Sequence, residues 1–365
     1  MERPWYRSFN WVMALGALAL SLAGVVFIGS ADLHSPDAAG EWRKQVVYIL
    51  IGLLVMATCA AIDYHKWQRW SFGLYIANLL LLGLVMVGGR SALGAQRWIT
   101  LGAVQFQPSE PAKLILAICV AALLARVAVV GWREIGMTVG AVAVPALLIL
   151  KQPDLGTTLV IFAIVTAELF FGVASLRQFL VYALGAFAGA ALVVGTNVVL
   201  KPFQRDRLLV FLHPDADPQG AGWNLNQSKI AVGSGEWFGK GLYHGTQTQL
   251  NFVPEHSRDF IFTVVGEETG YVGSLCLIGL YALVLFGAVR AMLAARDRFG
   301  VLLAAGLIAM FAFHITVNIG MTVGIMPITG IPLPFMSYGG TAILTDFAAV
   351  GVLLNIYVQR DKLVF

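Results

Sequence analysis

Residues 260–292 read FIFTVVGEETGYVGSLCLIGLYALVLFGAVRAM, and this apolar stretch decides the class of the fold. A helix needs roughly 20 predominantly apolar residues to cross the hydrocarbon core of a bilayer, and this stretch exceeds that length. Its first half carries Glu267 and Glu268, although ionisable groups at membrane depth are costly and usually face a cavity or a partner. We therefore expect a transmembrane helix that is broken or partly re-entrant in its first half, where protein or water covers the polar groups.

The rest of the chain repeats this apolar pattern. Of its 365 residues, 58% are hydrophobic and 12% are charged, and the mean hydropathy is +0.79. The composition predicts an all-α integral membrane protein, a polytopic bundle of about ten transmembrane helices in a single domain, 1–365, with a large extracytoplasmic loop, 201–257, between the seventh and eighth spans. The expected spans are 9–29, 43–62, 70–88, 109–127, 135–150, 156–174, 178–200, 260–292, 300–325 and 338–358.

The charge and the cysteines exclude several classes of protein. The net charge of +4 suits contact with anionic membrane lipid, and the chain has no basic run long enough to indicate nucleic-acid binding. Cys59, Cys119 and Cys276 all fall inside apolar stretches. An odd number of cysteines with none in a loop argues against disulfides and against a zinc site, so we expect packing roles.

The basic residues predict the orientation of the bundle, since short cytoplasmic loops are enriched in Lys and Arg. With the amino terminus inside, the inside segments hold 12 of the 24 basic residues and the short outside segments hold 6. Both termini are therefore expected in the cytoplasm. The long loop and the polar motifs then lie on the extracytoplasmic side.

Five carboxylates gather around the start of the eighth span, in a chain that has little charge elsewhere. They are Glu236, Glu255, Asp259, Glu267 and Glu268. If Ser257 caps the helix, Asp259 lies in its first turn, where the helix dipole favours the ionised form and burial opposes it. The alternative is that Asp259 only stabilises the helix start or pairs with Arg258.

Two further motifs join polar residues to helix starts. In Gln152-Pro153-Asp154-Leu155-Gly156-Thr157, Asp154 would cap the following helix. In 107–113, QPSEPAK, Ser109 suits a helix cap, and Glu110 and Lys113 share one helix face and can pair. Lys113 could equally meet a phosphate as a point charge.

The segment 327–340, PITGIPLPFMSYGG, holds three prolines and three glycines and cannot be a helix. At a membrane edge it is expected to line a cavity, where its backbone amides could receive an anion, or to be a rigid connector. Glu168, His314, Asn318 and Asp346 lie within the apolar spans, and interhelical hydrogen bonding is the expected role. A chain of titrating groups for proton transport is the alternative.

These motifs together resemble the SEDS family (shape, elongation, division and sporulation), and more its rod-shape branch than its division branch. The resemblance runs from roughly residue 94 to residue 351, and its pieces occur in one order: GAQRWI, QPSEPAK, QPDLGT, QSKIAVGSG, GKGLYHGTQTQLNFVPEHSRDFIF, GEETGYVG and NIGMTVGIMPITGIPLPFMSYGG. The chain departs from the family pattern at Ser257 and Arg258, at Glu236-Trp237 and at Pro111. Arg258 matters most, because a cation beside Asp259 would stabilise its ionised form and weaken it as a base.

The resemblance implies a multi-pass enzyme of the cytoplasmic (inner) membrane. It implies a peptidoglycan glycosyltransferase that polymerises lipid II into β-1,4 glycan strands at the outer face for cell elongation and rod shape, releases undecaprenyl diphosphate, and has a class B penicillin-binding protein, a transpeptidase, as partner. The essential acid of the family falls on Asp259. The candidate substrate-binding residues are Lys113, Glu110, Arg97, Asp154, Glu255, Arg205, Lys240 and Ser337.

The chemistry of these residues fits such a reaction. Asp259 is expected to accept the proton of the acceptor sugar's 4-hydroxyl as that oxygen attacks the donor's anomeric carbon. Positive charge for the leaving diphosphate is expected from Lys113, Arg97, Arg205 or Lys240, or from a divalent metal, Mg²⁺ or Mn²⁺, that bridges the diphosphate and acidic residues. The alternatives are a lipid II flippase and a non-enzymatic scaffold that activates a transpeptidase.

Overall fold

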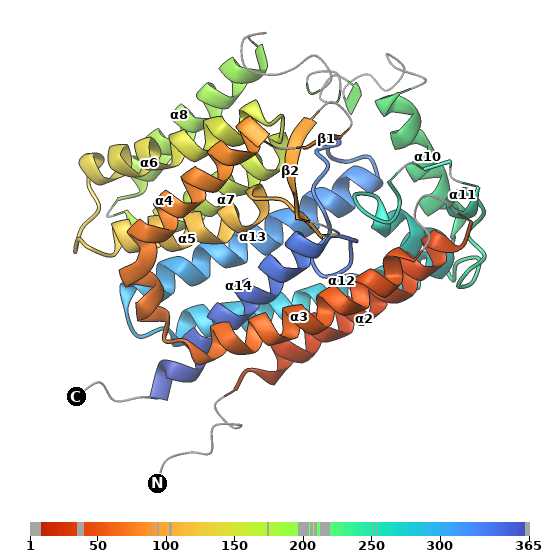
Figure 1. Ribbon diagram of the computed structural model, residues 1–365, viewed down its shortest axis with the longest axis horizontal. Helices are drawn as coiled ribbons and strands as arrows, with labels where there is room; N and C mark the ends of the chain where they lie inside the picture. Colours follow the sequence, from red (N-terminus) through yellow and green to blue (C-terminus); the bar gives the residue numbers. More distant parts are fainter. Residues whose placement is uncertain are drawn as a thin grey trace.

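Ten long helices form a single bundle in the part of the chain that the structure describes (Figure 1). The computed structural model describes residues 9–34, 40–88, 90–92, 95–101, 104–173, 175–195, 204, 207, 210–211, 220–250, 252–253 and 255–361. The long helices are α2 (Trp11–Ala31), α3 (Glu41–Ala61), α4 (Tyr64–Gly88), α5 (Ser109–Leu124), α6 (Trp132–Lys151), α7 (Leu155–Gly172), α8 (Leu176–Gly195), α12 (Ile261–Ala294), α13 (Arg298–Thr322) and α14 (Gly340–Val358).

The expected all-α bundle is confirmed. Each expected span coincides with one of these helices, except that residues 196–200 of the seventh span lie outside the described residues. Eight of the described helices are long and apolar enough to cross a membrane. The largest difference is α4, which begins at Tyr64 rather than near residue 70. Its first turns, YHKWQRW, are too polar to register in an apolar pattern, yet Tyr64 is buried against α13 and α14 by its contacts with Phe299 and Asn355.

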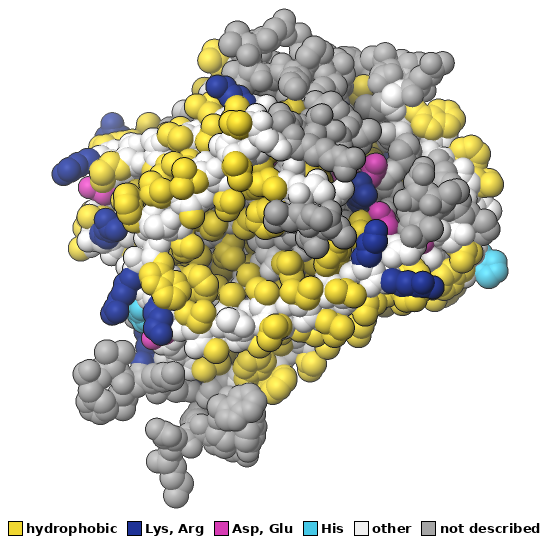
Figure 2. Space-filling view, in the orientation of Figure 1, with side chains coloured by type: hydrophobic (Ala, Val, Ile, Leu, Met, Phe, Trp, Pro, Cys, Tyr) yellow, Lys and Arg dark blue, Asp and Glu magenta, His cyan; other side chains and the backbone are white. Residues whose placement is uncertain are grey.

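The centre of the bundle is formed by α13 and α14, whose residues are largely buried. Helix α3 packs on α14, α7 packs on α13, and α2 packs on both α3 and α12, so α2 and α3 run side by side in Figure 1. Large hydrophobic side chains of α3, α4, α6 and α8 point outward. Figure 2 shows hydrophobic side chains across the middle of one face, with Lys and Arg mainly toward its ends, as expected for a surface that meets lipid.

Three short strands, which the all-α expectation did not include, lie between α4 and α5. They are β1 (Arg90–Ala92), β2 (Ala95–Leu101) and β3 (Val104–Phe106), and they form an antiparallel sheet in the order β1-β2-β3. The second pair is in register from Ile99↔Phe106 to Leu101↔Val104. Only β3, Val-Gln-Phe, alternates strictly between apolar and polar residues, so the sequence carries little strand signal here.

Helix α12 is broken at Gly270, which confirms the expectation from the sequence. Gly270 has φ +63° and ψ −159°, a backbone conformation outside the helical region. The backbone of 236–241 supplies replacement hydrogen bonds: Tyr271 N–H donates to Glu236 O at 2.8 Å, and Lys240 N–H donates to Glu267 O at 3.0 Å. The break is therefore covered by protein, as irregular backbone at membrane depth requires.

The described part of the long loop packs onto this broken helix. It contains α10 (Ala221–Ser234) and α11 (Thr246–Gln249), and α10 packs on α12 and α13. Ser228 Oγ lies 2.8 Å from Thr263 Oγ1 and donates to Thr322 O at 2.8 Å, which joins α10 to both helices. The loop is thus fixed to the end of the bundle at which α12 begins.

Candidate active site

Asp259 lies in the turn 255–260, immediately before α12 begins at Ile261. The expected helix cap at Ser257 is wrong, because the cap position is Phe260 and the Ser257 hydroxyl donates to Glu41 Oε2 at 2.8 Å. The turn is held from the other side by Asn318 of α13, whose Nδ2 donates to Asp259 O at 2.8 Å and to Ile331 O at 2.7 Å. Asn318 thus ties the Asp259 turn to the segment 327–339.

Gly330 brings the backbone of that segment against the Asp259 carboxylate. Its φ is +69°, and a Cβ at this position would lie 3.1 Å from Asp259 Oδ2 and 3.4 Å from Arg207 Nη1. A larger residue would be strained by its backbone and would crowd both charged groups. The glycine therefore lets a carboxylate and a guanidinium share a small space above the backbone.

Burial raises the pKa of Asp259 to about 6, although the side chain stays partly exposed. The neighbouring Glu255 carboxylate adds to this increase, because like charges disfavour ionisation. The guanidinium groups of Arg207, Arg258 and Arg97 oppose it. The carboxylate therefore titrates close to neutrality, where it can both accept and release a proton.

Arg258 does stabilise the ionised form of Asp259, as expected, but its effect is too small to lower the pKa of Asp259 below the usual value. Its guanidinium donates to Glu41 Oε1 at 3.2 Å and to Glu255 Oε2 at 3.1 Å, and it lies 5.7 Å from the centre of the Tyr338 ring. The two carboxylates therefore partly neutralise the positive charge of Arg258. Burial and Glu255 outweigh the opposing cations, so the pKa of Asp259 is raised and not lowered.

Ser337 is buried and binds the backbone of the Asp259 turn, so its hydroxyl does not face an opening. It is 4% exposed, its hydroxyl donates to Arg258 O at 2.6 Å, and it accepts from Leu333 N–H at 2.8 Å. Tyr338 N–H also donates to Ser257 O at 2.9 Å. The segment 333–338 and the Asp259 turn therefore form one hydrogen-bonded unit.

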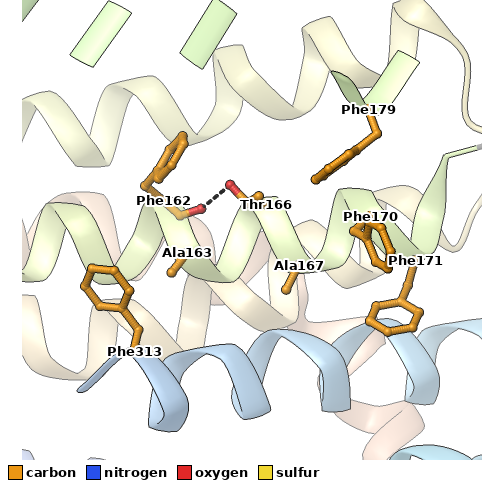
Figure 3. Close-up of a pocket in the computed structure, with 8 residues that line it drawn as sticks. All are labelled: Phe162, Ala163, Thr166, Ala167, Phe170, Phe171, Phe179 and Phe313. Carbon is orange, nitrogen blue, oxygen red and sulfur yellow. Dashed lines mark hydrogen bonds between the residues drawn. The ribbon is translucent and has the colours of Figure 1, made fainter. Parts of the chain in front are cut away.

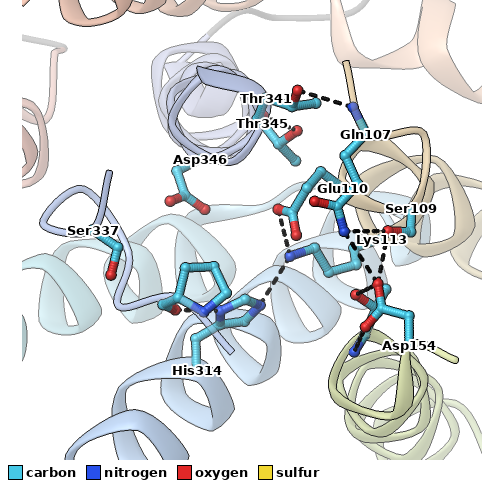
Figure 4. A network of polar contacts seen from close by, with 12 residues as sticks. Gln107, Ser109, Glu110, Lys113, Asp154, His314, Ser337, Thr341, Thr345 and Asp346 are labelled. Carbon is cyan, nitrogen blue, oxygen red and sulfur yellow. Dashed lines mark hydrogen bonds and ion pairs between the residues drawn. The ribbon is translucent and has the colours of Figure 1, made fainter. Parts of the chain in front are cut away.

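Lys113, Glu110 and His314 form a buried cluster on the other side of this unit (Figure 4). The Lys113 ammonium, 2% exposed, donates to Glu110 Oε2 at 2.8 Å, so the expected pair is present. It also lies 3.1 Å from His314 Nε2, while His314 Nδ1 lies 3.0 Å from Pro332 O. The carbonyl requires the proton on Nδ1, so Nε2 accepts from Lys113. Asp346 of α14 completes the cluster and accepts from Phe335 N–H at 3.3 Å.

Asp154 begins α7 as the expected cap, with Thr157 N–H donating to its Oδ1 at 3.2 Å. The expected Ser109 cap of α5 is wrong, because Ser109 Oγ instead donates to Asp154 Oδ2 at 2.9 Å. Arg97 of β2 donates from Nε to Gln152 O at 2.9 Å and from Nη2 to Pro153 O. The turn 152–154 therefore links the sheet, α5 and α7, and it positions Arg97 within electrostatic reach of Asp259.

The other candidate residues fall into separate places. Lys240 lies at the break in α12, where it donates to Glu267 Oε1 at 2.7 Å. Glu267 is completely buried and accepts further hydrogen bonds from residues 246–248, so this pair fastens the loop. Arg205 lies outside the described residues. Glu168 has no hydrogen-bond partner for either carboxylate oxygen among the described residues, so the expected interhelical bond is wrong there.

Sequence reasoning missed Arg207 and Glu41. Arg207 lies two residues after the candidate Arg205, and two arginines this close together in the run Arg205-Asp206-Arg207 could have indicated both as candidate cations. Glu41 sits in the first turn of α3, more than 200 residues from the turn that it binds, and no local pattern links the two. The described residues contain no group of three or more His, Cys, Asp or Glu side chains placed to hold a metal ion.

An apolar groove lies along α7, on the surface between α7, α8 and α13 (Figure 3). Its volume is about 370 Å³, and nearly all its accessible surface is apolar. The Thr166 hydroxyl in its wall donates to Phe162 O, so its polar group is satisfied. The lining residues are Phe162, Ala163, Thr166, Ala167, Phe170, Phe171, Phe179 and Phe313.

Known proteins resemble this chain over almost its full length. The family model described as cell cycle protein, which covers FtsW, RodA and SpoVE, matches residues 10–362. The chain is 38% identical over 352 residues to the peptidoglycan glycosyltransferase MrdB of Escherichia coli strain K12, covering 96% of this chain and 94% of that protein.

Two solved structures have the same fold. One, described as "Structural coordination of polymerization and crosslinking by a peptidoglycan synthase complex", matches with a TM-score of 0.82 and 31% identity, over 97% of this chain and 99% of that chain. A crystal structure of the rod shape determining protein RodA of Thermus thermophilus matches with a TM-score of 0.73 and 29% identity, over 97% of this chain and 98% of that chain.

Proposed function

The chain belongs to the FtsW, RodA and SpoVE family, the SEDS family, and from this premise we propose that it polymerises lipid II as a peptidoglycan glycosyltransferase. Lipid II joins a disaccharide-peptide to a polyprenyl diphosphate. Its reactive bond therefore lies at the lipid headgroup and its tail lies in hydrocarbon. A bundle with a polar site at one end of its helices and an apolar flank suits both parts.

Asp259 is the general base of the proposed reaction. Its carboxylate takes the proton from the 4-hydroxyl of the acceptor sugar, and that oxygen attacks the anomeric carbon of the donor sugar. The bond from the anomeric carbon to the diphosphate oxygen breaks, and undecaprenyl diphosphate leaves with the bonding electron pair. Attack opposite the leaving group inverts the anomeric carbon and gives a β-1,4 bond.

The observation that carries this proposal is the place of the Asp259 carboxylate, which is partly exposed just before α12 and lies with Arg207 beside Gly330, where burial and Glu255 raise its pKa to about 6. A general base is most effective when its pKa lies near the working pH, because it is then mostly ionised and still basic enough to remove a proton. An ordinary aspartate, with a pKa near 3.9, would be ionised but a much weaker base.

Arg207 and Arg97 are the cations that we assign to the leaving diphosphate. Both act electrostatically on the Asp259 carboxylate, so they flank the place where the sugar bond would break. A guanidinium group can bind phosphate oxygens through two parallel hydrogen bonds, a role that we assign to Arg207. Arg97 donates from Nε and Nη2 to Gln152 O and Pro153 O, so we assign to it only the neutralising charge. We assign Lys113 and Lys240 to holding the protein scaffold, because Lys113 is 2% exposed and Lys240 binds Glu267.

The groove on α7 offers an apolar surface for hydrocarbon. Phe162 follows Asp154 by eight residues, which places it about 12 Å along the helix from that end. An engineered apolar cavity of about 150 Å³ accommodates benzene, and the groove measures about 370 Å³. It therefore has room for a stretch of the lipid tail.

We propose that the site faces the extracytoplasmic side of the cytoplasmic membrane and that both termini face the cytoplasm. Arg296 and Arg298 lie at the end of α12 opposite Asp259, and such basic residues favour the cytoplasm. We also propose a class B penicillin-binding protein as partner and a role in cell elongation. The match to a structure of a peptidoglycan synthase complex and to a rod shape determining protein supports both.

The test is polymerisation of labelled lipid II by the purified protein in liposomes, with no other glycosyltransferase present. Wild-type protein is expected to form glycan strands, and Asp259→Asn is expected to lose about 10²- to 10⁴-fold in rate, as removal of a general base does. Glu134→Gln, a carboxylate that caps α6, is the control and should keep the wild-type rate. A flippase or scaffold would move lipid II or bind the transpeptidase without forming polymer.

A further inference from the structure

His256 lies three residues before Asp259, is 7% exposed, and has no part in the reaction described above. Its ring nitrogens each face a backbone carbonyl oxygen: Nδ1 lies 2.8 Å from Val253 O, and Nε2 lies 3.2 Å from Ala31 O. A neutral imidazole carries one N–H and could satisfy only one of these acceptors. Both contacts are hydrogen bonds only when the ring carries two protons and is therefore a cation.

The surroundings of the ring favour a positive charge. Ala31 is the last residue of α2, and the carbonyl groups at the end of a helix carry a partial negative charge. Asp32 follows it; burial raises the pKa of its carboxyl to about 6, and the attraction of His256 opposes this rise, so Asp32 carries its negative charge above that pH. Glu41 of α3 and Glu268 of α12 add negative charge through their bonds to Ser257 and Ser30. On the segment that carries the ring, the charged residues are Glu255, Arg258 and Asp259.

His256 begins a run of three residues that all bind the ends of α2 and α3. Ser257 Oγ donates to Glu41 at 2.8 Å, and Arg258 Nη2 donates to the same carboxylate at 3.2 Å. Asp259 follows directly and faces the other way, toward Arg207 and Gly330. The position of the Asp259 carboxylate is therefore set by how firmly this run is held.

We propose that His256, with both ring nitrogens protonated, is a positioning residue that fastens the Asp259 turn to the carboxyl-terminal end of α2. The inference rests on the proposed function of Asp259 as the base. Loss of the second ring proton removes one of the two hydrogen bonds, and the turn is then tied to α2 or to Val253 but not to both. Catalysis therefore declines on the alkaline side, independently of the ionisation of Asp259.

Nitrogen NMR on protein with ¹⁵N-labelled histidine tests the protonation state without any activity measurement. The chain has six histidines, and the signals of His256 are those that disappear in His256→Gln. At pH 6.5 we expect the two ring nitrogens to resonate together, as in a doubly protonated ring. Two widely separated signals, those of a neutral ring, would overturn the proposal.

Kinetics test the positioning role. His256→Gln is expected to lower kcat for lipid II by about 10- to 100-fold, with little change in KM and without the alkaline decline of the wild type. His244→Gln, an exposed histidine on the same loop, is the matched control and should behave as wild type. Wild-type kcat in His256→Gln, with only a lower melting temperature, would show a purely structural role.

Asp32→Asn keeps the ring and both carbonyl acceptors but removes the neighbouring negative charge. We expect it to move the alkaline decline to lower pH by at least half a unit, with kcat at pH 6.5 unchanged. An unmoved decline would contradict the proposal. Absence of polymerisation by the wild type would instead refute the proposed role of Asp259 as general base. The NMR result would still decide whether the His256 ring carries two protons.

Discussion

A carboxylate within electrostatic reach of three guanidinium groups would ordinarily stay ionised, yet burial and Glu255 hold the pKa of Asp259 at about 6. Glu255 raises the pKa of Asp259 and Arg207 lowers it, and each charge can be removed by a single substitution. We expect Glu255→Gln to move the acidic limb of the pH–rate profile to lower pH, because a like charge is lost. Arg207→Gln should move it to higher pH and also lower the rate. Shifts in the same direction would show that these charges do not act on the base.

The same pKa predicts a stability effect. Because the folded pKa lies above the unfolded value, the native state binds the proton more tightly, and stability falls as pH rises between about 4 and 6. Asp259→Asn removes this penalty, so we expect it to be more stable than wild type at pH 7.5 by about 1–2 kcal/mol, after allowance for solvent screening. The difference should close near pH 4. Thermal melts at both pH values measure it, and a less stable variant at pH 7.5 would contradict the argument.

For single residues, the sequence indicated which side chains are functional candidates but not which distant residues they bind. The Glu110–Lys113 pair and the Asp154 cap follow from spacing of three residues along a helix or turn, and both are present. Ser257 and Ser109 also looked like caps, but each binds a distant carboxylate, Glu41 or Asp154. Such tertiary partners cannot be derived from local spacing.

At the scale of elements, the break in α12 is the feature that joins the loop to the bundle. The polar residues in the first half of an apolar run, Glu267 and Glu268 among them, predicted it, because ionisable groups at membrane depth need cover by protein or water. What covers the break, the backbone of 236–241, could not be predicted. The exposure of the loop aromatics could not be predicted either. Trp237 is 66% and Phe238 is 81% exposed, while Gly235 and Gly239 lie directly against the backbone of α12.

Gly270→Ala tests the importance of the break. A Cβ there would lie 2.4 Å from Gly239 N, and φ is +63°, so we expect a loss of at least about 1–2 kcal/mol from the left-handed backbone alone. The matched control is Gly279→Ala in the same helix, where a Cβ would meet nothing within 4 Å and stability should stay the same or rise. Equal melting temperatures for the two variants would show that the break is not required.

For the whole molecule, hydropathy predicted the ten helices well, because each must be about as long as the bilayer is thick. It could not predict which helices meet, nor that α13 and α14 form the centre, since nearly every span is apolar all round. The small sheet was missed because its strands are short and lie between much stronger helical signals.

Orientation can be measured in intact cells with a membrane-impermeant maleimide, using the wild type, with its three cysteines, as the background. Leu242→Cys, on the loop beside the break, is expected to react without permeabilisation. Arg296→Cys, between α12 and α13, should react only after the membrane is opened. The reverse pattern would place Asp259 on the cytoplasmic side, away from any extracytoplasmic acceptor strand.

The most direct measurement of the central claim is the pH dependence of kcat/KM for lipid II polymerisation by the wild-type protein. The account predicts a rate that rises about tenfold per pH unit at low pH and bends at a midpoint near 6, the pKa of Asp259 in the free protein, before the separate decline on the alkaline side that we assign to His256. A rate that stays level from pH 4.5 to pH 7.5 would contradict it.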